Sequence, residues 1–402
     1  MFNNHKTITA LDIGTDTIKV LVVTKDPQGK EFEVLSQVSV PCSGVRKGVV
    51  MKPLQLAEEI RIAIEEAQLS SNQKISSVVL NVNGSHLSLI PSKGVVAVSR
   101  ADREISQEDI ARVMKNAQMV GLPSNKEIID VFPREFIIDG EKGIKDAIGM
   151  KGTRLEAEVF LLCAFSPYLQ NLTKAVSSAG LHPVDIKASP IAAAESVLTP
   201  QQKELGVVVI DIGADTTGMA VFEEENLIHM AVFPVGSKHI TNDIAIGFRC
   251  DINTAEKIKR EYGACTRKKE KSKKYRRDKI KFSDSLVFSR KMLIGIVEAR
   301  VSEIFELINK ELKKISRQKL LPAGVVLVGG GAKLSRIVDL CKKELKLPAR
   351  IGKPKGFIGL EEDPIWATAC GLVVDAAETE ETSSIGRGIL DKLKNLFRIF
   401  IP

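Results

Sequence analysis

The fold is decided by the stretch Asp12-Ile13-Gly14-Thr15-Asp16-Thr17, which recurs with one substitution as Asp211-Ile212-Gly213-Ala214-Asp215-Thr216. Each copy ends an apolar run (residues 8–13 and 207–212) and is followed by a second apolar run. We therefore expect two β-hairpins with tight, glycine-containing turns. A turn of this kind directs backbone N–H groups and threonine hydroxyls into one concavity, which suits a phosphate group.

The aspartate that ends each first strand, Asp12 or Asp211, can hold the water shell of Mg²⁺, an ion that usually keeps several waters in proteins. A single Asp-x-Gly stretch is most often an ordinary turn. Two copies in matching strand contexts, about half the chain apart, favour a binding site instead. Two such hairpins facing each other would bind the phosphates of a nucleotide from both sides.

A third element follows near residue 325, where an apolar run predicts a strand, Gly329-Gly330-Gly331 a turn, and residues 334–345 an amphipathic helix. Consecutive glycines between strand and helix let a base or ribose approach the backbone closely. The glycine spacing differs from the G-x-G-x-x-G of Rossmann turns. The sequence also contains no G-x-x-x-x-G-K-[ST] stretch, so we do not expect a P-loop ATPase.

The order of these motifs resembles the actin superfamily of ATP-binding proteins. The resemblance implies an α/β fold with two RNase H-like domains around a nucleotide cleft, and ATP with Mg²⁺ as ligands. It places magnesium, through water, at Asp12 and Asp211. Without the surrounding motifs, Glu256 and Lys259 would be interpreted as part of an ordinary solvated helix face. The nucleotide-binding positions implied by the resemblance are Asp12, Gly14, Thr15, Asp16, Thr17, Lys19, Asp211, Gly213, Ala214, Asp215, Thr216, Gly236, Glu256, Lys259, Gly329, Gly330 and Gly331.

Composition agrees with a soluble α/β protein of 402 residues, long enough for two domains. The six cysteines are scattered without a C-x-x-C pair, which indicates reduced thiols and neither a disulfide framework nor a zinc site. No apolar leader or membrane-length run is apparent, so we expect neither a signal peptide nor a spanning helix. Much of the net charge of +8 lies in residues 266–281, which we expect to form a basic surface loop. Because Tyr275 is the single aromatic residue in its basic core, we expect no nucleic-acid partner.

The C-terminal sequence predicts a linker and a membrane-binding helix. Residues 378–385 are mostly polar and acidic, and we expect them to be flexible. Residues 386–402 have the pattern of an amphipathic helix with cations opposite its apolar face, which suits anionic lipid. Docking on the body of the protein or in a partner's groove is the alternative. The apolar face contains Ile389, Leu390, Leu393, Leu396, Phe397, Phe400 and Ile401.

Residues 84–163 depart from the actin pattern. Ser106 and Asp109 predict the capped start of a helix that ends near Val120, and strands are expected at 95–99, 127–132, 136–139 and 155–163. This order, and the phrase Ile129-Asp130-Val131-Phe132-Pro133, resemble the 1C subdomain of the bacterial division family FtsA. In that setting we expect His86 at the junction of two subdomains and not as a catalytic base.

The whole chain resembles the FtsA family. The resemblance implies a polymerising actin homologue on the cytoplasmic side of the cell membrane at the division septum. It would bind anionic lipid through its tail, anchor the C-terminal peptide of FtsZ, and recruit later division proteins through 1C. Arg300 and Glu303 match the FtsZ-binding position, although they could equally be the outward charges of an ordinary helix.

The resemblance also sets the expected domain boundaries. They are 1–83 with 164–198 for domain I (1A), 84–163 for 1C, 199–242 with 305–377 for domain II (2A), 243–304 for the small subdomain 2B, 378–385 for the linker and 386–402 for the membrane helix.

One departure from the actin pattern limits the implied activity. Residues 187–194, at the start of the expected connecting helix, contain no carboxylate or amide to orient an attacking water. We therefore expect tight ATP binding and at most slow hydrolysis. A pilus-assembly homologue of the PilM type is the alternative function, but such a protein does not need a lipid-binding tail. A small-molecule kinase of the same fold is a further alternative, yet we find no residue in a context that suggests its catalytic base.

Overall fold

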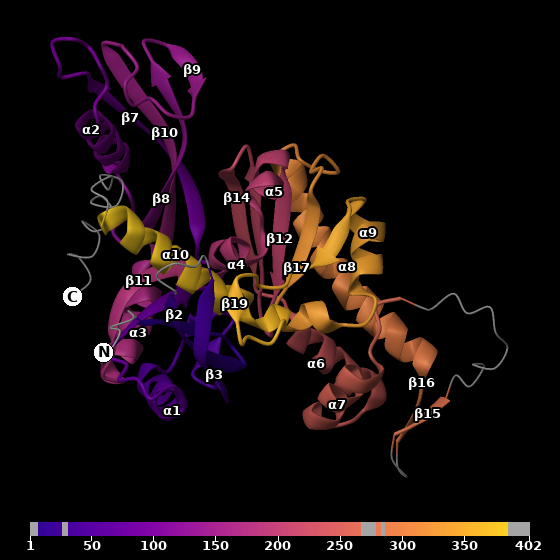
Figure 1. Cartoon of the computed structure of the whole chain (residues 1–402). Helices are drawn as coiled ribbons and strands as arrows, with labels where there is room; N and C mark the ends of the chain where they lie inside the picture. The colour runs from indigo at the N-terminus through magenta and orange to yellow at the C-terminus, as the bar shows by residue number, and fades with distance from the viewer. Residues whose placement is uncertain (1–6, 26–30, 267–278, 283–285, 385–402) are drawn as a thin grey trace.

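The computed structural model describes residues 7–25, 31–266, 279–282 and 286–384 (Figure 1). Within that part of the chain, two α/β domains lie side by side and a smaller subdomain is inserted into the first. Here domain I denotes residues 7–82, 166–197 and 357–384, and domain II denotes residues 200–351. The inserted subdomain denotes residues 88–165.

Domain I is built on a sheet with strand order β11-β6-β1-β2-β3-β19. Its central strands are apolar on both sides because helices cover both faces. α1 and α3 pack against one face, while α4 and α10 pack against the other. Its elements are β1 (Thr7–Ile13), β2 (Thr17–Lys25), β3 (Phe32–Pro41), β4 (Val45–Arg46), β5 (Val49–Val50), α1 (Pro53–Ser71), β6 (Ser77–Val82), α3 (Ser166–Ser178), β11 (His182–Ala188), α4 (Ser189–Val197), β19 (Phe357–Ile358), η3 (Pro364–Trp366) and α10 (Ala367–Ser384).

Domain II repeats this plan with strand order β14-β13-β12-β17-β18. α6, α8 and α9 cover one face of the sheet. On the other face, Val207 and Val209 belong to the same core cluster as domain I, so the two domains share buried apolar surface. Its elements are α5 (Pro200–Leu205), β12 (Val207–Ile212), β13 (Thr217–Glu223), β14 (Asn226–Phe233), α6 (Ser237–Phe248), α7 (Ile252–Tyr262), β15 (Lys279–Lys281), β16 (Val287–Ser289), α8 (Arg290–Lys314), β17 (Gly324–Val328), η2 (Gly330–Lys333), α9 (Ile337–Leu345) and β18 (Ala349–Ile351).

The inserted subdomain is a sheet of order β7-β10-β8-β9 with one helix on its face. The helix starts as its sequence predicts, because Ser106 and Asp109 form a reciprocal capping box. The two strands expected at 127–132 and 136–139 are one bulged strand, which continues through Pro133. The elements are β7 (Ser88–Ala97), α2 (Gln107–Gln118), β8 (Lys126–Ile138), β9 (Glu141–Ile144) and β10 (Arg154–Phe165).

The last part of domain II in our expected boundaries belongs to domain I. β19 pairs with β3, and α10 covers the domain I sheet at Ala10 and Leu21. α10 also packs closely on α4, where a Cβ at Gly371 would lie 1.5 Å from the carbonyl oxygen of Ala192. In addition, the expected boundary at 304/305 falls inside the continuous helix α8. The chain thus crosses back to domain I, which local pattern does not indicate.

The predicted linker also differs in the structure, since α10 continues to Ser384. Alanine and glutamate favour helix, and Thr379 Oγ1 donates to the Asp375 carbonyl one turn earlier instead of interrupting the helix. The predicted amphipathic helix at 386–402 lies outside the described residues, as does most of the basic loop 266–281. Among the described helices, none combines the length and apolarity needed to span a bilayer.

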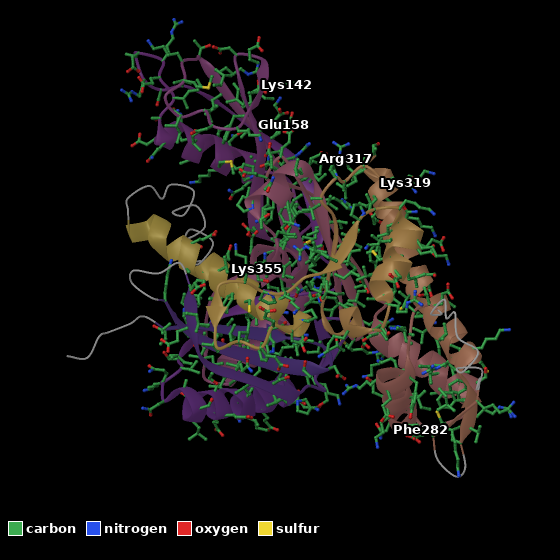
Figure 2. All side chains as sticks on the ribbon, turned by 45° about the vertical axis from the view of Figure 1, so that its right-hand side comes forward. Lys142, Glu158, Phe282, Arg317, Lys319 and Lys355 are labelled. Carbon is green, nitrogen blue, oxygen red and sulfur yellow. The ribbon has the colours of Figure 1, made fainter. Side chains whose placement is uncertain are left out.

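Figure 2 shows the molecule turned by 45°, with the inserted subdomain marked by Lys142 and Glu158. Phe282 lies at the opposite end of the molecule in Figure 2, where Figure 1 places the neighbouring β15–β16 ribbon. The cleft described below lies between these extremes, where β1, β12 and β17 all end.

Candidate functional site

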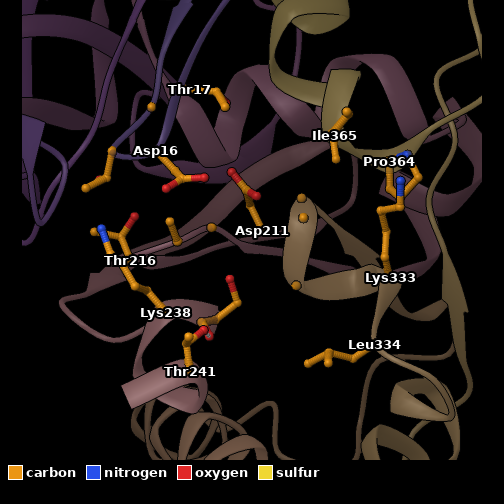
Figure 3. Close-up of a pocket in the computed structure, with 18 of the residues that line it drawn as sticks. Asp16, Thr17, Asp211, Thr216, Lys238, Thr241, Lys333, Leu334, Pro364 and Ile365 are labelled. Atoms are coloured by element: carbon orange, nitrogen blue, oxygen red, sulfur yellow. Dashed lines mark hydrogen bonds between the residues drawn. The ribbon is translucent and has the colours of Figure 1, made fainter. Parts of the chain in front are cut away.

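The two repeated stretches form matching turns. The N–H of Gly14 donates to the Thr17 carbonyl (3.0 Å), and the N–H of Gly213 donates to the Thr216 carbonyl (2.9 Å). A Cβ at Gly14 would lie 2.9 Å from the Thr17 oxygen, so the turn requires glycine there. Both predicted hairpins are therefore present, and they face each other across one cleft (Figure 3).

The cleft is a cavity of about 880 Å³ between the domains, large enough for a cofactor-sized ligand. Fifteen of the seventeen nucleotide-binding positions expected from the sequence line it. They are Asp12, Gly14, Thr15, Asp16, Thr17, Lys19, Asp211, Gly213, Ala214, Thr216, Glu256, Lys259, Gly329, Gly330 and Gly331.

Asp215 and Gly236 do not line this cavity. Asp215 faces a neighbouring pocket between the domains and accepts a hydrogen bond from the Lys47 N–H (3.4 Å). A Cβ at Gly236 would lie 2.6 Å from the Ala214 carbonyl oxygen, so this glycine lets α6 pack on the back of the second loop. The adjacent N–H of Ser237 donates to the Gly213 carbonyl (2.9 Å). Gly236 thus supports the loop from behind.

Charge at the floor of the cleft is carried by Asp12, Lys19 and Asp211. Lys19 Nζ lies 2.9 Å from Asp12 Oδ2. Burial lowers the pKa of Lys19, but the charge and hydrogen bond of Asp12 outweigh that effect and raise it. Burial raises the pKa of Asp211 to about 6, and the charge of Asp12 adds to the increase while Lys19 opposes it. The floor therefore carries negative charge that Lys19 does not fully neutralise.

This charge distribution fits a hard divalent cation. Mg²⁺ takes oxygen ligands and commonly uses one or two carboxylates with several waters. Asp12 and Asp211 supply such oxygens, and the raised pKa of Asp211 reports a site that favours added positive charge. No group of three or more His, Cys, Asp or Glu suited to direct metal ligation occurs among the described residues.

Asn81 is a cleft residue that the sequence analysis missed. The residue is 3% exposed, and its side-chain oxygen accepts from the Ile13 N–H (2.7 Å). Its amide nitrogen donates to Asp12 Oδ1 (2.8 Å) and to Ser189 Oγ (2.9 Å). Asn81 thereby ties the first loop to the start of α4. No local motif marks this residue, which becomes visible only once β6 is placed beside β1.

The glycine turn after β17 closes the far side of the cleft. Gly329 has φ = +80°, and a Cβ there would lie 2.2 Å from Asp211 Oδ1. A Cβ at Gly331 would lie 2.3 Å from Ile212 Cγ2, so the turn packs directly on the second loop. Leu334 and Ile365 add apolar surface beside the turn (Figure 3). The helix expected at 334–345 is α9, which starts at Ile337, and the 3-10 helix η2 lies before it in the turn.

Polar groups from α6 and α7 line the opposite wall. Glu256 lies 2.7 Å from Lys259 Nζ and accepts from Thr241 Oγ1 (2.6 Å). Burial alone would raise the pKa of Glu256, yet these hydrogen bonds outweigh it and hold the pKa at about 2. Burial lowers the pKa of Lys259, which Glu256 partly offsets. Both predicted residues therefore belong to the cleft, and a solvated helix face does not describe them.

Arg300 and Glu303 lie outside the cleft, on α8. Arg300 pairs with Asp243 of α6 through two nitrogens (2.7 and 3.0 Å) and also contacts Glu303. Ile246 and Met292, at the adjacent ends of α6 and α8, are 77% and 47% exposed. His86, at the base of the inserted subdomain, contacts the Tyr168 ring, and burial lowers its pKa. A partly buried imidazole packed against Tyr168 at this junction agrees with a structural role.

Comparison with solved structures defines the class of protein. A PilM–PilN type IV pilus biogenesis complex contains a chain that matches with a TM-score of 0.65 at 20% identity, covering 92% of this chain and 98% of that one. MreB5 of Spiroplasma citri matches with a TM-score of 0.56 at 14% identity, covering 95% and 99%. At these identities the likeness concerns the fold, which is the actin-like α/β fold expected from the sequence.

Sequence comparison then gives the family. The model described as cell division protein FtsA matches residues 208–371, and that of the SHS2 domain inserted in FtsA matches residues 84–163. The FtsA of Pseudomonas aeruginosa is 36% identical over 92% of this chain and 89% of its own length, and that of Bacillus subtilis is 34% identical over 92% and 83%. The chain belongs to the FtsA family, an actin-like family of bacterial cell division proteins, and the resemblance stated above is confirmed.

Proposed function

We propose that this protein binds ATP with Mg²⁺ between its two domains and uses the bound nucleotide to hold the domains closed. The observation that carries the proposal is the pair of matching turns that face each other with Asp12 and Asp211 between them. The MreB5 relative was solved with ADP, which supports a nucleotide in this fold. Magnesium would neutralise phosphate charge at the two carboxylates, while the loop N–H groups and Thr15 and Thr216 hold the phosphates.

A bound nucleotide would close the two domains because its phosphate-binding groups come from both of them. Thr15 belongs to domain I and Thr216 to domain II, so one ligand that contacts both favours the closed arrangement. A hydrogen bond from Asn83 to Thr216 Oγ1 (3.3 Å) already crosses the cleft. We expect the closed form to be the polymer-competent one. The filament formed by MamK, another actin-like protein of solved structure, supports self-assembly on this fold.

Slow or negligible hydrolysis is part of the proposal. Ser189 begins α4, and no carboxylate or amide of α4's first turns reaches the cleft. Asn81 brings an amide there, but its oxygen and nitrogen are engaged by Ile13, Asp12 and Ser189. An amide held in this way does not readily orient a water, which phosphoryl transfer to water needs.

The second part of the proposal concerns partners. We infer that the C-terminal peptide of FtsZ binds where α6 meets α8, beside Arg300 and Glu303. The exposed Ile246 and Met292 supply apolar contact next to an ion-paired arginine, a combination found in peptide-binding surfaces. Later division proteins would bind the inserted subdomain, and residues 386–402 would bind anionic lipid on the cytoplasmic face of the membrane. Together these contacts would form a polymer that tethers FtsZ to the membrane at the division septum.

Nucleotide binding is tested by titrating the full chain with ATP at millimolar Mg²⁺ in a calorimeter. We expect Asp211→Ala to weaken binding by about 10- to 100-fold, the usual loss for a charged contact. Unchanged affinity in Asp211→Ala, or no binding by the natural chain, would contradict the nucleotide assignment.

The partner surface is tested with a fluorescent C-terminal FtsZ peptide and the variant Glu303→Lys. Glu306→Lys is the matched control, because both glutamates are exposed on α8 and each contacts a cation. We expect only Glu303→Lys to weaken peptide binding. Equal effects of both variants would show that general charge, and not this surface, determines binding.

The membrane contact is tested by co-sedimentation with anionic vesicles, comparing the full chain with one truncated after Ser384. If the full chain sediments and the truncated chain does not, the result supports the tail as the membrane anchor. Equal sedimentation would assign lipid binding to another basic segment. If neither sediments, the PilM-type function becomes the better one, and the overall likeness to the PilM–PilN structure already gives it a basis.

A further inference from the structure

Lys187 is a buried cation outside the cleft. It lies on β11, and only 6% of the residue is exposed. Its Nζ atom lies 2.8 Å from Asp130 Oδ2, 3.3 Å from Asp375 Oδ1 and 4.0 Å from Asp185 Oδ2. We call these four residues the Lys187 cluster. A buried lysine is uncommon unless it is paired, so this arrangement calls for a physical reason.

The carboxylates of the cluster come from three separate parts of the chain. Asp130 belongs to β8 of the inserted subdomain, Asp185 to β11 itself and Asp375 to the C-terminal helix α10. A β-bulge at residue 129 immediately precedes Asp130, and such a bulge redirects the side chains that follow it. A second shift of register precedes Asp185 on β11. The backbone is thus irregular next to Asp130 and next to Asp185, the two carboxylates of the cluster that lie on strands.

Charge in the cluster is unbalanced, because three carboxylates share one ammonium group. Burial lowers the pKa of Lys187, but Asp130, Asp375 and Asp185 together raise it well above its ordinary value. Burial also raises the pKa of Asp185, and its acidic neighbours add to the increase. The Oδ2 atom of Asp375 is buried and has no hydrogen-bond partner within the described residues. Asp375 therefore depends on Lys187 for its stabilisation.

We propose that Lys187 couples the placement of the inserted subdomain to the placement of α10. Each of these parts holds a carboxylate against the same buried cation, so movement of one carboxylate changes the electrostatic stabilisation of the other. α10 leads directly into residues 385–402, and β8 forms the base of the inserted subdomain (Figure 1). A force or ligand that moves α10 therefore changes how strongly Lys187 stabilises Asp130, and with it the placement of the inserted subdomain. This coupling stands on the described contacts and does not require the proposed function.

The experiment is hydrogen–deuterium exchange on the full chain with Asp375→Asn and Asp130→Asn, which keep side-chain size and remove charge. We expect Asp375→Asn to speed exchange in β8 about tenfold, although Asp375 belongs to another element. Asp130→Asn should likewise speed exchange in α10. Tenfold is within the coupling range observed for residues that share a partner. Asp185→Asn is the matched control, because Asp185 lies on the same strand as Lys187 and links no second element.

A merely local role predicts a different result. Exchange that changes only in α10 for Asp375→Asn, and only in the inserted subdomain for Asp130→Asn, would overturn the proposal. A second measurement covers poor folding of either variant. In the natural chain Asp130→Asn should lower Tm, whereas in a Lys187→Met background it should raise Tm or restore soluble protein, since it removes an unpaired buried carboxylate. The same sign in both backgrounds would also overturn the coupling.

Discussion

The first and second loops share five of six residues and the same turn, yet they differ in charge balance. Asp12 pairs across its hairpin with Lys19, whereas Asp211 pairs at the equivalent position with Gly218. A Cβ at Gly218 would lie 2.5 Å from Pro190 Cγ, so the start of α4 occupies the space that a cation fills in the first hairpin. The close contact between domains thus leaves Asp211 without a cation on its own hairpin. Domain I has a charge-balanced loop, and domain II has one whose charge favours a positively charged ligand.

The largest expected effect comes from removing the carboxylate that balances the charge of Lys19 in the first loop. Asp12→Asn leaves the buried Lys19 without its partner, and losing one member of a buried ion pair costs about 3 kcal/mol or more. We expect a lower free energy of unfolding at pH 7, measured by urea denaturation. Lys343→Met, which removes an exposed ion pair with Glu298, is the control and should leave the free energy of unfolding nearly unchanged.

The second prediction concerns the contact that causes the asymmetry. Gly218→Ala forces a methyl group against Pro190 and should destabilise the protein by about 2 kcal/mol. Gly330→Ala is the matched control, because a Cβ there meets nothing within 4 Å and its φ is not positive. Thermal unfolding of both variants measures the difference. Similar values of Tm would mean that α4 can move away from β13, and the explanation for Gly218 would be wrong.

The third prediction is a substitution that raises the free energy of unfolding, whereas the first lowers it. The pKa of Asp211 is about 6 in the folded chain and about 4 in an unfolded one, so the folded state holds this proton more tightly. The resulting stabilisation is present below about pH 4 and is lost as pH rises through 6. Asp211→Asn should therefore stabilise the ligand-free protein by about 1–2 kcal/mol at pH 8, a value reduced for the openness of the cleft, and hardly at pH 4.5.

That result is checked by urea denaturation at both pH values without nucleotide. Destabilisation at pH 8 would show that Asp211 is compensated by a group of domain II. Stabilisation equal at both pH values would show that the effect has no connection with its ionisation.

The smallest expected effect concerns Lys259, one of the cations that domain II places in the cleft. Lys259 is engaged by Glu256 and Thr241, so it does not neutralise Asp211. Glu256→Gln should lower stability by about 1 kcal/mol at pH 7, since it weakens a charge-assisted hydrogen bond. The pH dependence attributed to Asp211 should stay as it is. A shift of that pH dependence would show that Lys259 senses Asp211 after all.

Local sequence predicted the parts of the site that local structure determines. The two Asp-x-Gly turns place their glycine against a carbonyl oxygen of the same turn, a local contact that could be recognised without a structure. The glycine run after β17 could be recognised as a pattern, although the contacts that require glycine at 329 and 331 come from the second loop. The capped start of α2 was predictable because its capping contacts are likewise local. The likeness of two distant stretches then indicated that they act together.

Residues defined by neighbours in space were not predictable in this way. Asn81 has no motif of its own, and its role depends on which strands lie beside β6. Asp215 sits in the repeated motif but faces a different pocket, whereas Asp16 at the matching position lines the cleft, so the motif alone does not determine which residues reach the site. The side chains of α10 pack on the domain I sheet, a contact that is set by tertiary structure and was not expected from the sequence of residues 367–384.

The return of α10 to the first domain has a consequence for synthesis. Strands β1 and β2 leave the ribosome early, but the helix that covers Ala10 and Leu21 comes some 350 residues later. At about 5–20 residues per second, that interval lasts on the order of 20 to 70 seconds. During this time the part of the sheet face that α10 covers has no cover from its own chain. The first domain to be made is thus among the last to be completed, and any residues that follow α10 emerge only as that core closes.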